Sequence, residues 1–153
     1  MRDVNMLMHS NKGKCMKAKE YLSQLRLLNI KVDQRMKELS EMRERVSILT
    51  GIDYSKDRIQ VTPTTGNKQI EELVDFEKTI IDMVQCETRL KHKVIGEIQQ
   101  LENPIHVDLL FRIYVEDNDL QEIADDMGYT YNYVCTVHGN ALNDFQNKVL
   151  NKS

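Results

Sequence analysis

The sequence predicts an all-α fold, in which a long antiparallel two-helix coiled-coil hairpin is followed by a three-helix helix-turn-helix domain. Two long stretches have a seven-residue apolar repeat, turn residues separate them, and closely spaced helix caps follow. With only 6 Gly and 2 Pro among 153 residues, 41% hydrophobic and 29% charged, the composition favours helices. We expect a flexible extension at 1–13, the hairpin at 14–102 with a loop at 50–68, and the helix-turn-helix at 103–150.

The two long helices are predicted from about Lys14 to Leu49 and from about Gln69 to Leu101. The repeat of the first helix consists of Ala18, Leu25, Val32, Leu39 and Val46, interleaved with Tyr21, Leu28, Arg35, Met42 and Leu49. The repeat of the second helix consists of Leu73, Ile80, Glu87, Val94 and Leu101, interleaved with Phe76, Met83, Leu90 and Glu97. Gly and Pro residues between the two helices let the second fold back on the first.

A register for the hairpin follows from its apolar layers, which align when paired residues have numbers that sum to 122. Arg35 then faces Glu87, and we expect this charged pair to fix the alignment. Glu97 faces Leu25, so we expect it to lack a partner near a solvated end.

Some apolar residues of the hairpin lie outside its repeat, namely Leu22, Met36, Ile81 and Ile98. A second copy of the chain, forming a homodimer, or the rest of the same chain is needed to cover them. Two interpretations stay open: the hairpin binds a partner, or it buries its own apolar stripe and acts as a spacer.

Helix caps divide the last third of the chain. Asn103 suits an N-cap and Pro104 the first helical position, so a helix is predicted from there to about Glu116. Asp119 and Glu122 have the spacing of a capping box, in which each side chain satisfies a free backbone amide of the other. A short second helix therefore begins here and runs to the residues before Gly128.

A glycine turn and a longer helix complete this pattern. Gly128 can adopt a positive φ at the end of the short helix, and Thr130 is a suitable N-cap for a last helix from Tyr131 to about Val149. Short helix, glycine turn and longer helix are typical of a helix-turn-helix, against the alternative of an ordinary helical hairpin. The residues expected to form its core are Ile123, Met127, Val134, Val137 and Leu142, and Ala124 is small where two helices cross closely.

The segment LQEIADDMGYTYNYVCTVHGNAL, residues 120–142, resembles the helix-turn-helix of sigma-70 region four. It is more similar still to that of small phage and prophage transcriptional regulators of the ArpU type from Gram-positive bacteria. MKAKEYL, residues 16–22, resembles the start of those proteins, which implies that residues 1–15 are an extension or that Met16 is the start. The resemblance implies a sigma-factor-like transcription regulator that binds promoter DNA through its last helix and contacts RNA polymerase.

By analogy with helix-turn-helix docking, the exposed start of the last helix reaches the major groove of double-stranded DNA. The expected DNA-binding residues are Thr130, Tyr131, Asn132, Cys135, Thr136 and Asn140. Asn132 is the best candidate for reading a base, because its amide can bind adenine through two hydrogen bonds. Thr130 and Tyr131 suit phosphate contacts.

The charge of the chain departs from this pattern. Relatives commonly have Arg or Lys where this sequence has Cys135, Thr136, Asn140, Asn143 and Asp144. Residues 1–50 contain 11 Lys or Arg against 6 Asp or Glu, whereas residues 105–153 contain 3 against 8. Since phosphate neutralisation supplies non-specific DNA affinity, the isolated last domain is expected to bind duplex DNA weakly.

Two alternatives address the missing charge. In the first, the basic start of the chain supplies it, through Lys12, Lys14, Lys17, Lys19 and Arg26. In the second, the degenerate helix-turn-helix is a protein–protein interaction module without duplex affinity of its own.

The sequence gives no sign of enzymatic chemistry. It has no nucleophile-elbow, P-loop or dinucleotide-binding motif, and its Cys and His residues lack the spacing of metal ligands. These residues are Cys15, Cys86, Cys135, His9, His92, His106 and His138. No apolar run approaches the roughly 20 residues that cross a bilayer. We expect a cytoplasmic, non-enzymatic protein without cofactor, metal, small-molecule substrate or membrane partner.

Overall fold

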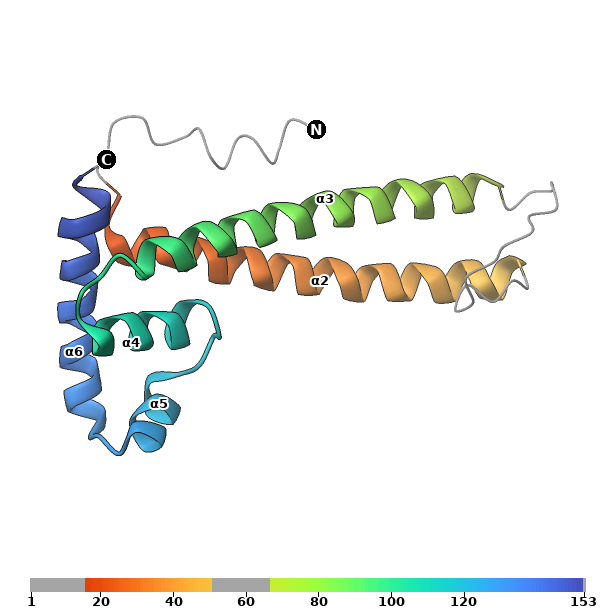
Figure 1. Ribbon diagram of the computed structural model, residues 1–153. Helices are drawn as coiled ribbons and strands as arrows, with labels where there is room; N and C mark the ends of the chain where they lie inside the picture. Colours follow the sequence, from red (N-terminus) through yellow and green to blue (C-terminus); the bar gives the residue numbers. More distant parts are fainter. Residues whose placement is uncertain (1–15, 51–66, 153) are drawn as a thin grey trace. The chain divides into compact units, whose positions relative to one another are not determined.

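The computed structural model describes residues 16–50 and 67–152, and every regular element in this part of the chain is helical (Figure 1). The elements are α2 (Ala18–Thr50), α3 (Asn67–Ile98), α4 (Pro104–Tyr114), α5 (Leu120–Met127), α6 (Tyr131–Phe145) and the π-helical η1 (Gln146–Leu150). The predicted all-α fold is confirmed, with a long antiparallel helix pair followed by three shorter packed helices. The predicted extension at 1–13 and most of the predicted loop at 50–68 lie outside the described residues.

The chain forms two compact units. One unit contains residues 16–26 together with residues 91–152, and the other contains the described part of Leu27–Leu90. The first turns of α2 and the last turns of α3 therefore belong to the same unit as α4, α5 and α6. The sequence predicts a domain boundary at residue 103, whereas this unit contains residues from both sides of that position.

The unit formed by Leu27–Leu90 has its core between α2 and α3. The buried cluster consists of Leu39, Val46, Leu73 and Ile80, with Met42, Ile70 and Phe76 packed against it. These residues, Ile70 apart, are members of the predicted apolar repeats, so the repeat correctly identifies this core. Leu49, which the predicted register places on Leu73, is 70% exposed instead.

The predicted charged layer between Arg35 and Glu87 is wrong. Arg35 pairs with Glu38 on its own helix at 2.7 Å, and its guanidinium lies 5.7 Å from the centre of the Phe76 ring. The side chain of Arg35 is half exposed, so water solvates its charge and no buried carboxylate is required. An ion pair between the two helices links Arg43 to Glu77, at 2.7 Å.

The other unit encloses the start of α2. The Ala18 backbone amide donates to Gln146 Oε1 at 2.7 Å, and the Tyr21 ring stacks on Phe145 with the ring centres 6.1 Å apart. The Tyr21 hydroxyl donates to Glu97 at 2.6 Å. The expectation that Glu97 lacks a partner is therefore wrong, because the last helix covers this end of the helix pair.

Among residues 16–50 and 67–152, no helix is both long enough and apolar enough to cross a membrane.

Candidate nucleic-acid interface

Three caps fix the helix-turn-helix formed by α5 and α6. The Asp119 carboxylate accepts from the Gln121 and Glu122 amides at 2.7 and 3.0 Å, and the Glu122 carboxylate accepts from the Asp119 amide at 3.4 Å. Gly128 ends α5 with φ at 68°, and the Thr130 hydroxyl accepts from the Tyr133 amide at 3.3 Å. The predicted capping box, the glycine turn and the Thr130 cap are all confirmed.

The cap at the start of α4 is confirmed as well. The Asn103 side chain accepts from the Ile105 amide at 3.0 Å, and Pro104 occupies the first helical position. Both α4 and α5 pack against α6. The residues buried in these helices are Leu109, Leu110, Ile113, Tyr114, Ile123, Ala124, Val134, Ala141 and Phe145. Of the predicted core, Met127, Val137 and Leu142 are half-buried.

Two polar contacts fix the rotation of α6 about its own axis. His138 Nε2 lies 3.0 Å from the Tyr114 hydroxyl, and His106 Nδ1 lies 3.0 Å from Asp144. Burial, and then the charge of Lys19, lower the pKa of His138, while burial raises the pKa of Tyr114 to about 12. The hydrogen bond from His106 lowers the pKa of Asp144. With one side of α6 held in this way, its opposite side faces solvent.

The solvent-facing side of α6 contains most of the predicted DNA-binding residues. Thr130, Tyr131, Asn132, Thr136 and Asn140 are exposed, whereas Cys135 is half-buried. Interaction with the neighbouring Cys135 side chain raises the pKa of Tyr131.

Not all of these polar groups are available to a ligand. The Thr130 hydroxyl serves as the helix cap, and the Thr136 hydroxyl donates to the Asn132 carbonyl at 3.0 Å. Within the described residues, the side-chain amides of Asn132 and Asn140 have no hydrogen-bond partner. These two amides are therefore the groups on α6 that are best placed to contact a base.

The surface of α5 is acidic. Glu122, Asp125 and Asp126 are exposed on it. Arg112 on α4 pairs with Asp108 at 3.1 Å and with Asp126 at 3.4 Å. In helix-turn-helix complexes the first helix of the motif crosses the DNA backbone, and carboxylates at such a position repel phosphate.

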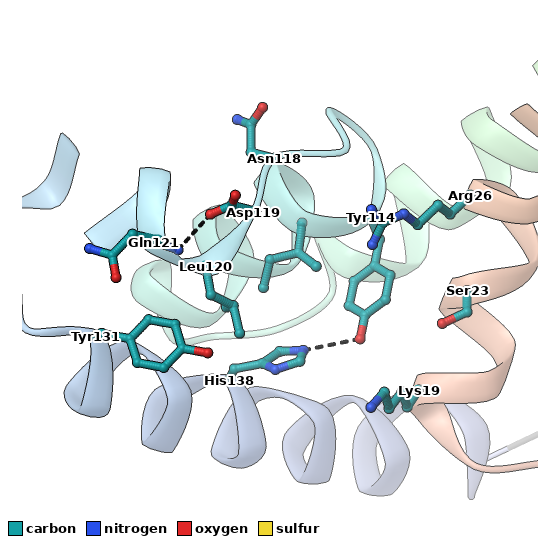
Figure 2. A pocket seen from close by; sticks show the side chains of 11 residues that line it. Lys19, Ser23, Arg26, Tyr114, Asn118, Asp119, Leu120, Gln121, Tyr131 and His138 are labelled. Atoms are coloured by element: carbon teal, nitrogen blue, oxygen red, sulfur yellow. Dashed lines mark hydrogen bonds between the residues drawn. The ribbon is translucent and has the colours of Figure 1, made fainter. Parts of the chain in front are cut away.

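A groove of about 470 Å³ lies beside α6, between the start of α2, the end of α4 and the start of α5 (Figure 2). It is lined by Lys19, Ser23, Arg26, Ile113, Tyr114, Asn118, Asp119, Leu120, Gln121, Tyr131 and His138. Arg26 pairs with Asp117 at 2.6 Å, whereas exposed Lys19 has no carboxylate partner among the described residues.

The groove is lined both by Lys19, a cation of α2, and by residues of α6, the predicted DNA-binding helix. Sequence reasoning selected Lys19 only as one of five basic residues, and it missed Ser23 and Gln121. Lys12 and Lys14 lie outside the described residues. Gln121 lies two residues after the predicted N-cap Asp119, and this position at the start of a helix is the sequence feature that could have identified it.

Three tyrosines surround the turn of the motif. Tyr129, Tyr131 and Tyr133 are 43%, 47% and 45% exposed, and the rings of Tyr129 and Tyr133 lie 4.8 Å apart. In the described residues, no three His, Cys, Asp or Glu side chains group as metal ligands, and Cys86 and Cys135 are free thiols.

Comparison with known proteins gives no family for this chain. No family model matches it, and no solved structure matches it either. One curated protein, acireductone dioxygenase from Danio rerio, is 37% identical over 67 residues. The match covers 40% of this chain and 37% of the dioxygenase, and so partial a match carries no argument about activity.

Proposed function

We propose that this protein is a phage-type transcription regulator, similar to sigma-factor region four, that acts at promoter DNA, at RNA polymerase, or at both. One observation carries the proposal: a firmly capped helix-turn-helix presents the exposed, uncharged polar side of α6, starting at Thr130. In helix-turn-helix proteins, residues near the start of the second helix contact base edges in the major groove.

The residues divide into two roles. Asn132 and Asn140 lie two helical turns apart on the exposed side of α6, and each amide can bind the edge of adenine through two hydrogen bonds. Lys19 and Tyr131 line the adjacent groove, where an ammonium and a hydroxyl suit phosphate oxygens (Figure 2). Backbone contact thus comes from α2, whose basic start compensates in part for the absence of cations on α6.

The electrostatics predict modest binding that depends weakly on salt. With one phosphate neutralised by Lys19, the logarithm of the binding constant falls with the logarithm of the salt concentration with a slope of about −1. The carboxylates of α5 limit contact on the other side of the motif. Specificity therefore depends on base contacts from α6 more than on charge.

Binding of fluorescent duplexes by the full-length chain tests the proposal, with a duplex selected from a random pool and measured at about 50 and 200 mM salt. Asn132→Ala is expected to weaken binding of the selected duplex by about 5- to 150-fold, since one bidentate base contact contributes roughly 1–3 kcal/mol. Asn147→Ala, an exposed Asn beyond the end of α6, is the matched control and is expected to bind like the wild type. Equal loss in both variants, or no binding at the lower salt, contradicts direct DNA recognition.

A second candidate function is protein binding without duplex affinity. The acidic surface of α5 and the exposed Tyr129 and Tyr133 favour it, since tyrosines and complementary charge are typical of protein interfaces. The partner would then present a basic surface, and RNA polymerase is the first to test. In that case Asp125→Lys abolishes capture of purified polymerase by the full-length chain, whereas Asn132→Ala leaves it unchanged.

A further inference from the structure

Helix α3 has a second apolar row beside the one that packs on α2. Leu73 and Ile80 are 1% and 3% exposed in the core of the Leu27–Leu90 unit. Val74, Ile81 and Val84 are 42%, 54% and 36% exposed. At 100° per residue, positions spaced by seven and three share one side of a helix, so these three residues form a continuous apolar row.

This row borders a groove of about 330 Å³ between α2 and α3. The groove is lined by Met36, Leu39, Arg43, Glu77, Ile80, Ile81, Val84 and Gln85. Met36 is 46% exposed at its α2 side. An apolar row next to a mostly apolar groove is the surface that helix packing between two molecules requires, with ridges of one helix entering grooves of the other.

The charges beside the row are self-complementary. Glu71, Lys78, Asp82 and Arg89 are exposed and, at spacings of seven, four and seven, follow one another along α3. When a second α3 lies antiparallel with a two-fold axis near Ile80, Lys78 faces Asp82 of the second copy, and Glu71 faces Arg89 of that copy. Both pairs arise from the same axis, as an isologous interface demands.

We propose that a second copy of this chain covers the apolar row, with α3 packed antiparallel on α3 around a two-fold axis near Ile80. The Val74, Ile81 and Val84 side chains fill the interface, and the two kinds of ion pair flank it. Lys78 has only a 4.0 Å contact with Asp75 in the single chain, so its ammonium is free to reorient towards the second copy. This interface is independent of the proposed DNA-binding function, because all its residues belong to the Leu27–Leu90 unit.

Ile81→Lys tests the apolar part of the interface, through the mass of the full-length chain measured by sedimentation equilibrium. The wild type is expected to be a dimer at about 50 µM, and the variant a monomer with unchanged helical circular dichroism, because Ile81 is half exposed in the single chain. Arg45→Glu, at an exposed position of α2 outside the groove, is the control and stays dimeric. A monomeric wild type overturns the proposal, since the row is then covered by another part of the chain or by a different protein. A dimeric Ile81→Lys variant overturns it as well.

A mixing experiment tests the antiparallel arrangement. Lys78→Glu alone and Asp82→Lys alone each place like charges opposite one another twice, so each variant is expected to dimerise about tenfold more weakly. Mixed in equal amounts, the two variants restore two attractive pairs between unlike copies and form a heterodimer. A pair within one helix gives no such result, since each variant contains only one of the two changes. Failure of the mixture to dimerise overturns the two-fold antiparallel packing.

Discussion

The contribution of His138 to the stability of the fold depends on pH. Its ring contacts the Tyr114 hydroxyl at 3.0 Å, and burial followed by the Lys19 charge lowers its pKa below the ordinary value. The unfolded chain therefore takes up a proton on His138 at a higher pH than the folded chain does. The contribution of this residue to stability is complete above about pH 6.5, the ordinary His pKa, and is lost as the pH falls towards the pKa of the folded state.

We predict that His138→Gln reduces the loss of unfolding free energy between pH 7 and pH 5, as measured by urea denaturation. His92→Gln, at an exposed position of α3, is the control and is expected to keep the pH dependence of the wild type. A His138→Gln chain with an unchanged pH dependence would show that the half-buried imidazole does not oppose protonation.

Single residues also show what a sequence can predict. The Asp119–Glu122 capping box and the Thr130 cap are local, because each side chain bonds an amide two or three residues away, and both are predicted correctly. The Tyr21–Glu97 hydrogen bond joins residues 76 positions apart. No local pattern encodes such a contact, so it becomes visible only when the fold is known.

At the scale of elements, the turn between α5 and α6 depends on one left-handed residue. Gly128 has φ at 68°, and a Cβ added there meets nothing within 4 Å, so the cost of a side chain is backbone strain alone. We predict that Gly128→Ala lowers the unfolding free energy by about 1–2 kcal/mol in urea denaturation. Gly139 lies in α6, and a Cβ added there also meets nothing within 4 Å. Gly139→Ala is therefore expected to raise the unfolding free energy by about 0.5–1 kcal/mol.

The two substitutions are thus predicted to change the unfolding free energy in opposite directions. Equal effects of Gly128→Ala and Gly139→Ala would mean that the αL conformation does not limit the turn.

The helix pair shows where sequence reasoning at the scale of elements fails. The apolar repeats identify Leu39, Val46, Leu73 and Ile80 as core, because burial follows helical period. The register does not follow, since the apolar layers of two long helices match at several offsets. Arg35 cannot select among these offsets, because a half-exposed guanidinium finds Glu38 on its own helix.

At the scale of the whole molecule, the sequence predicts the order of the elements but not their grouping into units. The last turns of α3 and the first turns of α2 join the helix-turn-helix, and Lys19 therefore lines the same groove as Tyr131. Helical period alone predicts that the chosen α6 residues share a side, and five of the six are exposed. The contribution of α2 to the same site is not predictable, since more than a hundred residues separate the two segments.

The most direct test of DNA recognition by α6 is a nuclear magnetic resonance titration. The amide spectrum of the full-length chain is recorded as a selected duplex is added at about 50 mM salt. The account predicts shifts at Thr130, at residues 131–140 of α6 and around Lys19, with the exposed acidic residues of α5 unaffected, and smaller shifts at higher salt. Shifts confined to α5, or an unchanged spectrum, would contradict DNA recognition by α6.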